Sequence, residues 1–198
     1  MAIANDTFVE ASDTSLVSHT PTGTDAGAGW AALTSAAATV RAATDDVIDN
    51  NGSEGNRFRM TTDLGSAVMD VQADITRTAA SFVFPGVLFR ISSDFVTFCE
   101  FTYDDTRWYI YDGTNEVFLT ESWPGGTVTM LAQSRTGSQK GYANGTLKVT
   151  ISADQLNGNH YGGLILGNFS GGAGKSTADN YLSNSVAPGN PWAAYAQQ

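Results

Sequence analysis

The chain has 198 residues, of which 20 are acidic and 10 are Lys or Arg, so its formal net charge is −10. The basic residues are dispersed, which excludes the basic stripe that nucleic acid or an anionic membrane would need. Hydrophobic residues make up 41% of the chain, enough for a packed core, and the single cysteine, Cys99, excludes an intrachain disulfide. No apolar run reaches the roughly 18 residues of a membrane span, and the first residues lack the features of a signal peptide.

Residues 30–47, WAALTSAAATVRAATDDV, have two interpretations. Trp30, Leu33, Ala37 and Val40 stand at helical spacing, and alanine is the best helix former. The segment lacks charge before Arg41, however, and contains several threonines. We lean towards strand.

Acidic and amide residues crowd the next stretch, DDVIDNNGSEGN at residues 45–56. Asp45, Asp46 and Asp49 offer oxygen ligands of the kind that Ca²⁺ prefers, so this stretch is a candidate metal site. An EF-hand register does not fit, because Gly52 would require an acid where Val47 stands. A solvated acidic loop is the alternative, and we expect no cofactor other than Ca²⁺.

Strands are predicted through the middle of the chain, where apolar and polar residues alternate. AVMDVQADITRT is predicted to bury Met69, Val71, Ala73 and Ile75. GVLFRISS and DFVTFCEFTYDD follow, with the predicted core-facing sets Val87, Phe89 and Ile91, and then Phe95, Cys99, Phe101 and Tyr103.

A hairpin is predicted at residues 107–121, RWYIYDGTNEVFLTE, where Asp-Gly supplies the positive-φ positions of a tight turn. TVTMLAQSR and GTLKVTISADQL add two more strands. Strand signals recur about every 8–12 residues, which is typical of a β-sandwich or barrel. We find no linker and predict one β-sandwich domain over residues 1–182.

The aromatic residues of this hairpin are candidate sugar-binding groups. Trp108 and Ile110 have one parity and Tyr109 and Tyr111 have the other, so one pair must face the core. Tyrosine suits a wet surface better than the Trp-Ile pair does. Tyr109, Tyr111 and the nearby Trp123 are therefore the candidates, with cross-strand packing as the alternative.

The glycine-rich stretch GGLILGNFSGGAGKSTADN ends in Gly-Lys-Ser, like a phosphate-binding loop. That loop needs a glycine at position 169, which is Phe169, so no phosphate cradle is expected around Lys175. We predict a hairpin instead, in which residues 161–169 and 177–186 are the two strands.

The last segment, residues 183–198, carries no charge and is predicted to be a tail. Pro188 and Pro191 exclude a regular helix or a central strand. Trp192 and Tyr195 are large, rigid side chains that would anchor the tail, so we predict that the tail packs, either back on its own domain or, through these two residues, onto a neighbouring subunit.

A dispersed pattern in the first 30 residues resembles the opening of concanavalin A-like (laminin-G-like) jelly-roll domains. Those domains are found in phage virion proteins and in bacterial glycan-associated proteins. The segments GVLFRIS, FCEFTYDDTRWYIYDGTNEVFL and GGLILGNF…ADNYLSN resemble the family's central strands and its final glycine-rich turn. The resemblance implies an all-β, antiparallel two-sheet sandwich with little helix. The residues that carry the opening pattern are Asp6, Phe8, Leu16, His19, Pro21, Gly29 and Trp30.

Enzymes of similar fold, the laminarinases, carry Glu-x-Asp-x-x-Glu on one strand, where the first two carboxylates share a face. The chain lacks such a run. Its nearest set is Glu100 with Asp104 and Asp105, and about 13 Å of strand separates Glu100 from Asp104. His19 and His160 are isolated from each other. We therefore predict a protein without enzymatic activity.

The resemblance implies a structural component of a phage virion, either a capsid decoration or a tail-associated protein. Such a protein would be made in the host cytoplasm without a signal peptide and would lie at the virion surface. Its partners would be other virion proteins or copies of itself, with a host surface glycan as a further partner. Neither nucleic acid nor membrane is expected to bind. The alternative is a carbohydrate-binding or polysaccharide-cleaving protein of the same fold.

Overall fold

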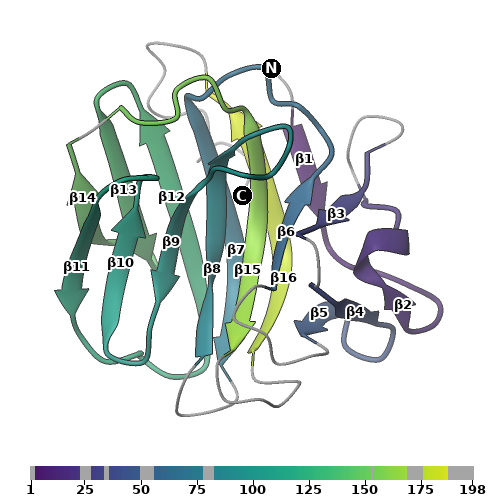
Figure 1. The fold of residues 1–198 in the computed structure, drawn as a ribbon. Helices are drawn as coiled ribbons and strands as arrows, with labels where there is room; N and C mark the ends of the chain where they lie inside the picture. Colours follow the sequence, from purple (N-terminus) through teal and green to yellow (C-terminus); the bar gives the residue numbers. More distant parts are fainter. Residues whose placement is uncertain are drawn as a thin grey trace.

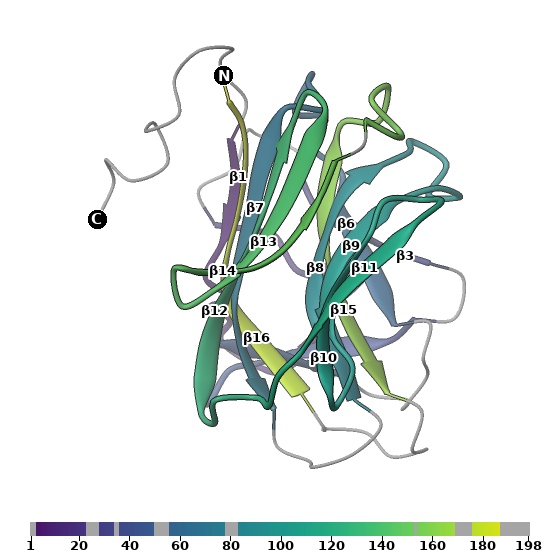
Figure 2. The same ribbon diagram turned by 90° about the vertical axis from the view of Figure 1, so that its left-hand side faces the viewer.

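Two antiparallel sheets stacked face to face make up the fold (Figure 1), in a computed structural model that describes residues 3–22, 28–33, 36–49, 56–77, 83–152, 154–168 and 176–186. The nine-stranded sheet has the order β14-β13-β12-β7-β16-β5-β4-β2, with β1 paired to β16. The seven-stranded sheet has the order β11-β10-β9-β8-β15-β6-β3. Figure 2 shows the two layers nearly edge-on. The predicted all-β two-sheet sandwich is confirmed.

The strand bounds are as follows. The nine-stranded sheet contains β1 (Ile3–Asp6), β2 (Thr14–Ser15), β4 (Ala38–Arg41), β5 (Asp46–Asp49), β7 (Met69–Arg77), β12 (Thr127–Arg135), β13 (Ser138–Ala143), β14 (Thr146–Ile151) and β16 (Ser176–Ser185). The seven-stranded sheet contains β3 (Trp30–Ala32), β6 (Arg57–Met60), β8 (Val83–Ile91), β9 (Cys99–Tyr103), β10 (Arg107–Tyr111), β11 (Glu116–Thr120) and β15 (Tyr161–Asn168). A short 3₁₀ turn, η1 (Leu16–Ser18), precedes β3.

The core lies between the two sheets, because alternate residues of each strand point inward. Met69, Val71, Ala73 and Ile75 of β7 are all buried there, as their alternation predicts. Cys99 also faces this core, and burial raises the pKa of its thiol to about 12, so the thiol is inert at neutral pH.

The described residues between 30 and 47 contain the strands β3, β4 and the start of β5, as the threonines and the lack of charge favoured. Trp30 begins β3 in the seven-stranded sheet, and Val40 lies on β4 in the nine-stranded sheet. Both are buried in the core between the sheets. Their helical spacing therefore arises from two strands that bury residues from opposite sheets.

The predicted hairpin at residues 107–121 is present as β10 and β11, with Gly113 at φ 96° in its turn. The predicted hairpin near the C-terminus is wrong, because β15 pairs with β6 and β8 while β16 pairs with β1, β5 and β7. The connection between β15 and β16 crosses from one sheet to the other. Lys175 lies outside the described residues.

Two predicted core positions are wrong because the chain departs from regular alternation after Phe89. Arg90 has φ 48°, and the pairing of β15 with β8 shifts register at this point. Arg90 consequently points inward, while Ile91 turns to the outer face of the seven-stranded sheet. Phe95, in the loop between β8 and β9, joins Ile91 on that outer face.

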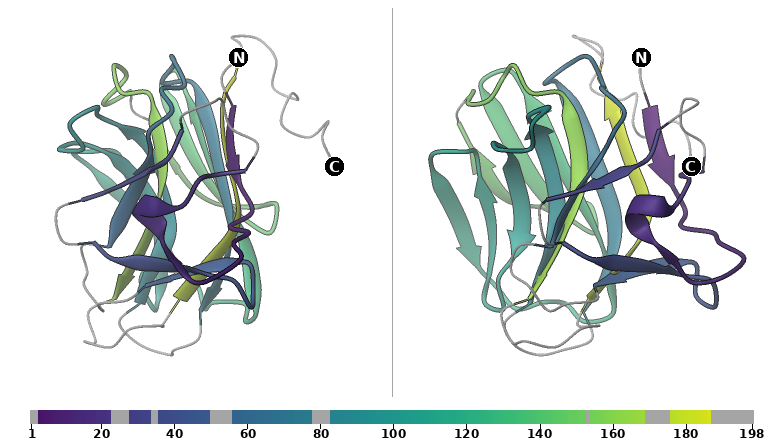
Figure 3. Two further views of the ribbon diagram at one scale, coloured as in Figure 1. Left: turned by 90° about the vertical axis from the view of Figure 1, so that its right-hand side faces the viewer. Right: turned by 45° about the vertical axis from the view of Figure 1, so that its right-hand side comes forward.

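The N-terminal elements β1, β2, η1 and β3 lie at the side of the sandwich opposite β11 and β14 (Figure 1), and Figure 3 shows the same side, in purple, from two further angles. The buried residues of the opening pattern include Asp6, Phe8, Leu16, His19 and Trp30. Asp6 accepts hydrogen bonds from Trp30 Nε1 at 2.7 Å and from the backbone N–H of Phe8 at 2.9 Å. His19 contacts Asp6 through Nε2 at 2.9 Å and Glu10 through Nδ1 at 2.6 Å. These bonds hold the N-terminal segment against the edges of both sheets.

At the C-terminal end, β16 continues to Ser185, three residues past the predicted domain end at 182, and the next residue, Val186, is buried. No helix of the described residues is long and apolar enough to cross a membrane.

Candidate functional site on the outer face of the seven-stranded sheet

The outer face of the seven-stranded sheet carries polar and aromatic side chains in cross-strand rows. Trp108 and Ile110 face the core, so Tyr109 and Tyr111 point outward, as their parity predicted. The register places Tyr111 opposite Glu100, and Glu100 opposite Leu88. The seven-stranded sheet is the front layer in Figure 1, so its outer face is turned towards the viewer.

Glu100 is the carboxylate at the centre of this face, on β9. Its side chain is only 7% exposed although it points away from the core. The phenol of Tyr109 donates a hydrogen bond to Oε1 at 3.0 Å, and Arg57 donates to Oε2 through Nε at 3.4 Å and Nη2 at 3.3 Å. Both donors point at the carboxylate, so Glu100 accepts hydrogen bonds on each of its two oxygens.

Tyr109 is the complementary group of this pair. Burial first, and then the negative charge of Glu100, raise the pKa of the Tyr109 phenol. The phenol therefore stays protonated at neutral pH, as its hydrogen bond to Glu100 requires. Together, Glu100 and Tyr109 place a proton acceptor and a proton donor within hydrogen-bond distance on one surface.

Arg57 reaches Glu100 from β6, across two intervening strands, β15 and β8. The residues next to Arg57 in its cross-strand row are Ile165 on β15 and then Gly86 on β8, and Gly86 has no side chain to obstruct the guanidinium. A Cβ on Gly86 would lie 2.2 Å from the carbonyl oxygen of Phe101. Glycine at this position thus allows β8 and β9 to approach closely beneath the guanidinium.

A small apolar cluster borders the Glu100 site. Leu88, Ile91, Phe95 and Ile165 are buried together, and Leu33, Phe98 and Tyr161 pack against them. The loop between β8 and β9 covers this part of the face (Figure 1). Phe98 lies under the guanidinium of Arg57, with 4.9 Å between the guanidinium carbon and the ring centre. The apolar cluster shields one side of the ion pair from water.

Of the predicted sugar-binding residues, the structure brings two together. Tyr109 and Tyr111 share the outer face, each half-buried. Trp123 lies on the other side of the sheet, stacked on the core residue Trp108 with 5.4 Å between ring centres. Its parity could not be read from the sequence, because it follows the end of β11.

The predicted metal ligands lie far from this face, on the nine-stranded sheet. Arg41 binds both carboxylate oxygens of Asp46, at 2.7 and 2.5 Å. Burial would raise the pKa of Asp46, but hydrogen bonds from Arg41 and Thr44 outweigh it and lower that pKa. Asp45 is exposed in the preceding turn, and the side chain of Asp49 lies outside the described part. No metal-binding group of three His, Cys, Asp or Glu occurs among the described residues, and the Ca²⁺ site stays a prediction.

The remaining predicted residues do not enter the site. Asp104 and Asp105 lie in the turn between β9 and β10, where Asp104 pairs with Arg107 and Asp105 pairs with Arg77. Trp192 and Tyr195 lie outside the described residues, so their subunit contact stays a prediction.

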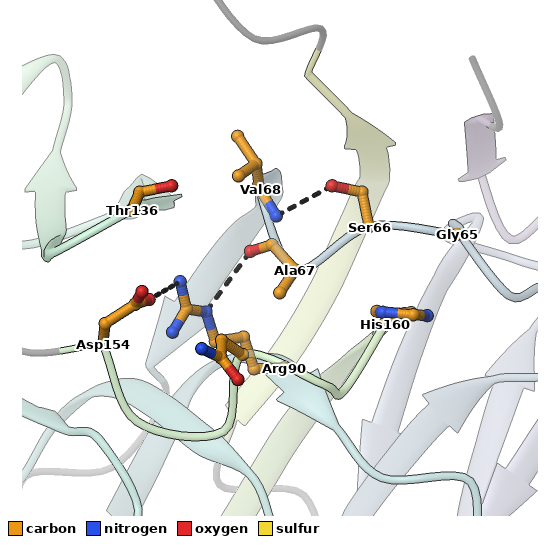
Figure 4. Close-up of a pocket in the computed structure, with 9 residues that line it drawn as sticks. Gly65, Ser66, Ala67, Val68, Arg90, Thr136, Asp154 and His160 are labelled. Atoms are coloured by element: carbon orange, nitrogen blue, oxygen red, sulfur yellow. Dashed lines mark hydrogen bonds and ion pairs between the residues drawn. The ribbon is translucent and has the colours of Figure 1, made fainter.

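Apart from this face, a hollow with a volume of about 440 Å³ lies at one end of the sandwich, and Figure 4 shows the residues that line it. Arg90, 1% exposed, donates through Nε to Ser134 Oγ at 2.6 Å, and its Nη2 lies 2.9 Å from Asp154 Oδ1. Its Nη1 donates to the backbone of Gln155 at 2.5 Å. Arg90 thus ties three segments together, and we interpret its role as structural.

Sequence reasoning missed Arg57, Arg59, Phe98 and Tyr161 as residues of the outer face. For Arg57 and Arg59 a signal existed, because RFRM alternates charged and apolar residues between the buried Phe58 and Met60. The pairing of Arg57 with Glu100, 43 residues later, depends on sheet order and could not be inferred.

Comparison with known proteins gives a match in structure alone. No family model matches the sequence, and no curated protein matches it significantly. A Bacillus licheniformis beta-glucanase is 10% identical with a TM-score of 0.58, over 89% of this chain and 99% of that one. An endo-acting O-glycanase of the human gut microbiota is 10% identical (TM-score 0.60; 94% and 100% covered). The alginate lyase AlgAT5, from polysaccharide lyase family 7, is 17% identical (TM-score 0.52; 79% and 85% covered).

The prediction of a protein without enzymatic activity is contradicted by these comparisons, because the similar solved structures include glucanases, an O-glycanase and a lyase. The absence of Glu-x-Asp-x-x-Glu was a poor criterion, since one fold carries several chemistries on different residues. None of these structures is named as a virion protein, so the virion role gains no support from them. The chain has the concanavalin-like jelly-roll fold that glycosidases and polysaccharide lyases share.

Proposed function

We propose that this protein binds a polysaccharide across the outer face of the seven-stranded sheet and cleaves it there. In hydrolysis Glu100 accepts a proton from the attacking water as the water oxygen bonds to the anomeric carbon; in elimination it accepts the proton of the sugar carbon next to the one that bears the leaving oxygen, and a double bond forms between these two carbons. In both cases Tyr109 donates its proton to the glycosidic oxygen as the bond from that oxygen to the sugar carbon breaks. The fold's use by glycan-cleaving enzymes supports the proposal, and the arrangement around Glu100 carries it.

The single observation behind this assignment is a nearly buried carboxylate on the outward side of a sheet. A strand needs no charge at such a position to fold, and removing a carboxylate from water costs several kcal/mol unless partners compensate. The side chain of Arg57 extends across two strands and forms an ion pair with Glu100, which offsets the cost of removing the carboxylate from water. Nearly buried charges of this kind, paired beside a titratable donor, are typical of functional sites.

The surrounding residues suit a sugar chain. Tyr109 and Tyr111 are two residues apart on β10 and therefore lie on the same face. Phe118 of β11 stands opposite Tyr109, and 54% of its surface is exposed. Aromatic faces of this kind offer the apolar contact that sugar rings use, while Glu100 and Arg57 supply hydrogen bonds.

Reducing-end release from a panel of polysaccharides tests the proposal, because both hydrolysis and elimination create a new reducing end. Glu100→Gln keeps the shape of the side chain and is expected to lower turnover about 100-fold or more. Glu121→Gln is the matched control, since Glu121 pairs with Lys148 outside the site. Equal turnover in the two variants, or binding without any cleavage by the native chain, contradicts the proposal.

The setting of this activity stays a prediction. Attachment to a virion, a host surface glycan as the target, and docking through residues 183–198 are compatible with a polysaccharide-acting protein. Mass spectrometry of purified virions tests the first of these directly.

A further inference from the structure

We infer that Arg59 forms a subsite for the carboxylate of an acidic sugar, so that the polysaccharide bound by this face contains uronic acid. This inference rests on the proposed function and adds the substrate class. It comes from a difference between Arg59 and the other arginines.

Six of the chain's seven arginines pair with a carboxylate, and within the described residues Arg59 pairs with none. The paired arginines are Arg41, Arg57, Arg77, Arg90, Arg107 and Arg135. In a chain with twice as many acidic as basic residues, a half-buried arginine without an acidic partner is unusual. The charge of Arg59 is available to a ligand.

Arg59 is held in place by contacts that leave part of its guanidinium free. The guanidinium carbon lies 4.4 Å from the centre of the Tyr161 ring. Nη2 donates to the backbone oxygen of Ser93 at 2.9 Å, and Nη1 donates to that of Met60 at 3.3 Å. These bonds use two of the five N–H groups of an arginine. The remaining terminal N–H groups keep the planar fork that a carboxylate binds.

Arg59 lies at the β3–β6 end of the outer face, beside the apolar cluster, and the buried Leu88 of that cluster stands between it and Glu100. The cross-strand neighbours of Arg59 are Gly163 on β15 and Ala31 on β3, so small residues flank it on both sides. Glu100 lies in the same row, three strands away, or about 14 Å at the usual strand spacing. Arg59 is therefore a binding residue at some distance from the reacting bond.

The net charge of −10 does not oppose this assignment at short range. Charges separated by more than about 8 Å are largely screened at physiological ionic strength. Arg57 and Arg59 lie two positions apart on β6, and the charge of Arg57 is paired with Glu100. An acidic sugar that reaches this end of the face therefore meets the guanidinium of Arg59 as the group without a carboxylate partner among the described residues.

Binding of defined polymers tests the inference. The probes are polygalacturonate and alginate as uronic acid polymers, a neutral β-glucan, and dextran sulfate as a polyanion without carboxylates. The native chain is expected to bind a uronic acid polymer. Arg59→Gln should weaken this binding about tenfold or more, because a charge-assisted hydrogen bond is lost. Arg41→Gln, which removes one positive charge from the other sheet, should leave it unchanged.

The controls separate this inference from the proposed function. Thermal unfolding checks that Arg59→Gln is folded, and Arg59→Lys, which keeps the charge without the fork, is expected to bind at an intermediate level. If the native chain binds only the neutral glucan, in a manner that Tyr111→Ala weakens, the acidic subsite is wrong and the glycan face stands. Tighter binding of dextran sulfate than of any uronic acid polymer also overturns the subsite. If no glycan binds, both proposals fail.

Discussion

Two buried carboxylates, Asp6 and Glu100, solve the same physical problem in different places. Asp6 is sealed inside the sandwich edge and is held by short bonds from Trp30, His19 and the backbone. Glu100 faces outward and is held by two side chains at 3.0–3.4 Å, one of which comes from three strands away. The bonds around Asp6 stabilise the fold, whereas a ligand could replace one of the two side chains that bind Glu100. Burial of a carboxylate therefore indicates function only when the carboxylate lies on a face that a ligand can reach.

The largest expected effect is the loss of stability when Asp6, the structural carboxylate of the two, is replaced. Asp6→Ala leaves Trp30 Nε1 and His19 without their acceptor inside the fold, and removal of one partner from a buried pair costs about 3–5 kcal/mol. Urea unfolding should show a loss of that size. Glu100→Gln keeps the shape of the side chain and an acceptor for Tyr109, and the Arg57 side chain is 21% exposed and can be hydrated, so this variant should lose less, about 1 kcal/mol. Equal losses in the two variants would mean that Glu100 is structural as well.

Tyr109→Phe tests the proton donor with the aromatic ring retained. The variant keeps the ring contact but removes the phenol, so turnover should fall about 100-fold. The dissociation constant for the polysaccharide should hardly change. A loss that lies entirely in binding would contradict the role of Tyr109 as donor.

Gly86→Ala alters the surface on which the Arg57–Glu100 pair rests. The added Cβ would lie 2.2 Å from the oxygen of Phe101 and 2.5 Å from Thr102 Cγ2, so β8 and β9 must separate. Overpacking of this kind costs about 1–3 kcal/mol, and turnover should fall as well, because Glu100 lies on β9. Gly125→Ala is a control for stability alone, because Gly125 has φ 87° but no atom within 4 Å of an added Cβ. If Gly86→Ala lowers stability while turnover is fully retained, the close approach of β8 and β9 is not needed by the site.

The smallest effect concerns pH. Burial would lower the pKa of His19, but its hydrogen bonds to Asp6 and Glu10 outweigh burial and raise it above the ordinary 6.5. A histidine with a raised pKa in the folded chain stabilises it fully below about pH 6.5, and this contribution is lost as pH rises through the folded pKa. The free energy of unfolding should therefore decrease above pH 6.5 in the native chain. In His19→Gln, this part of the pH dependence should be absent, and its persistence would contradict the assignment.

The local sequence pattern predicted much of the fold and the outward orientation of the two tyrosines. Alternation placed Tyr109 and Tyr111 on the outer face, and the Asp-Gly dipeptide placed their hairpin. Sheet order was not available, so the sequence joined β15 to β16 as a hairpin when the two lie in different sheets. A positive φ at Arg90 broke the alternation on which the placement of Ile91 depended.

The site itself was hidden for a related reason. Glu100 was identified from the sequence, but it was judged against carboxylates on its own strand. Its actual partners are Tyr109 on the next strand and Arg57 on a strand three positions away in the sheet. Contacts across a sheet depend on which strands are neighbours, and periodicity along one strand carries no such information.

An NMR titration with an oligosaccharide that the native chain cleaves, carried out on Glu100→Gln, tests the central claim most directly. The largest chemical-shift changes should fall on the backbone amides of β9, β10 and β6, above all at Tyr109, Tyr111 and residues 57–59. Small changes are expected on β12, β13 and β14 of the opposite sheet. Shifts concentrated on the nine-stranded sheet, or around Arg90 and Asp154 at the end of the sandwich, would contradict the account.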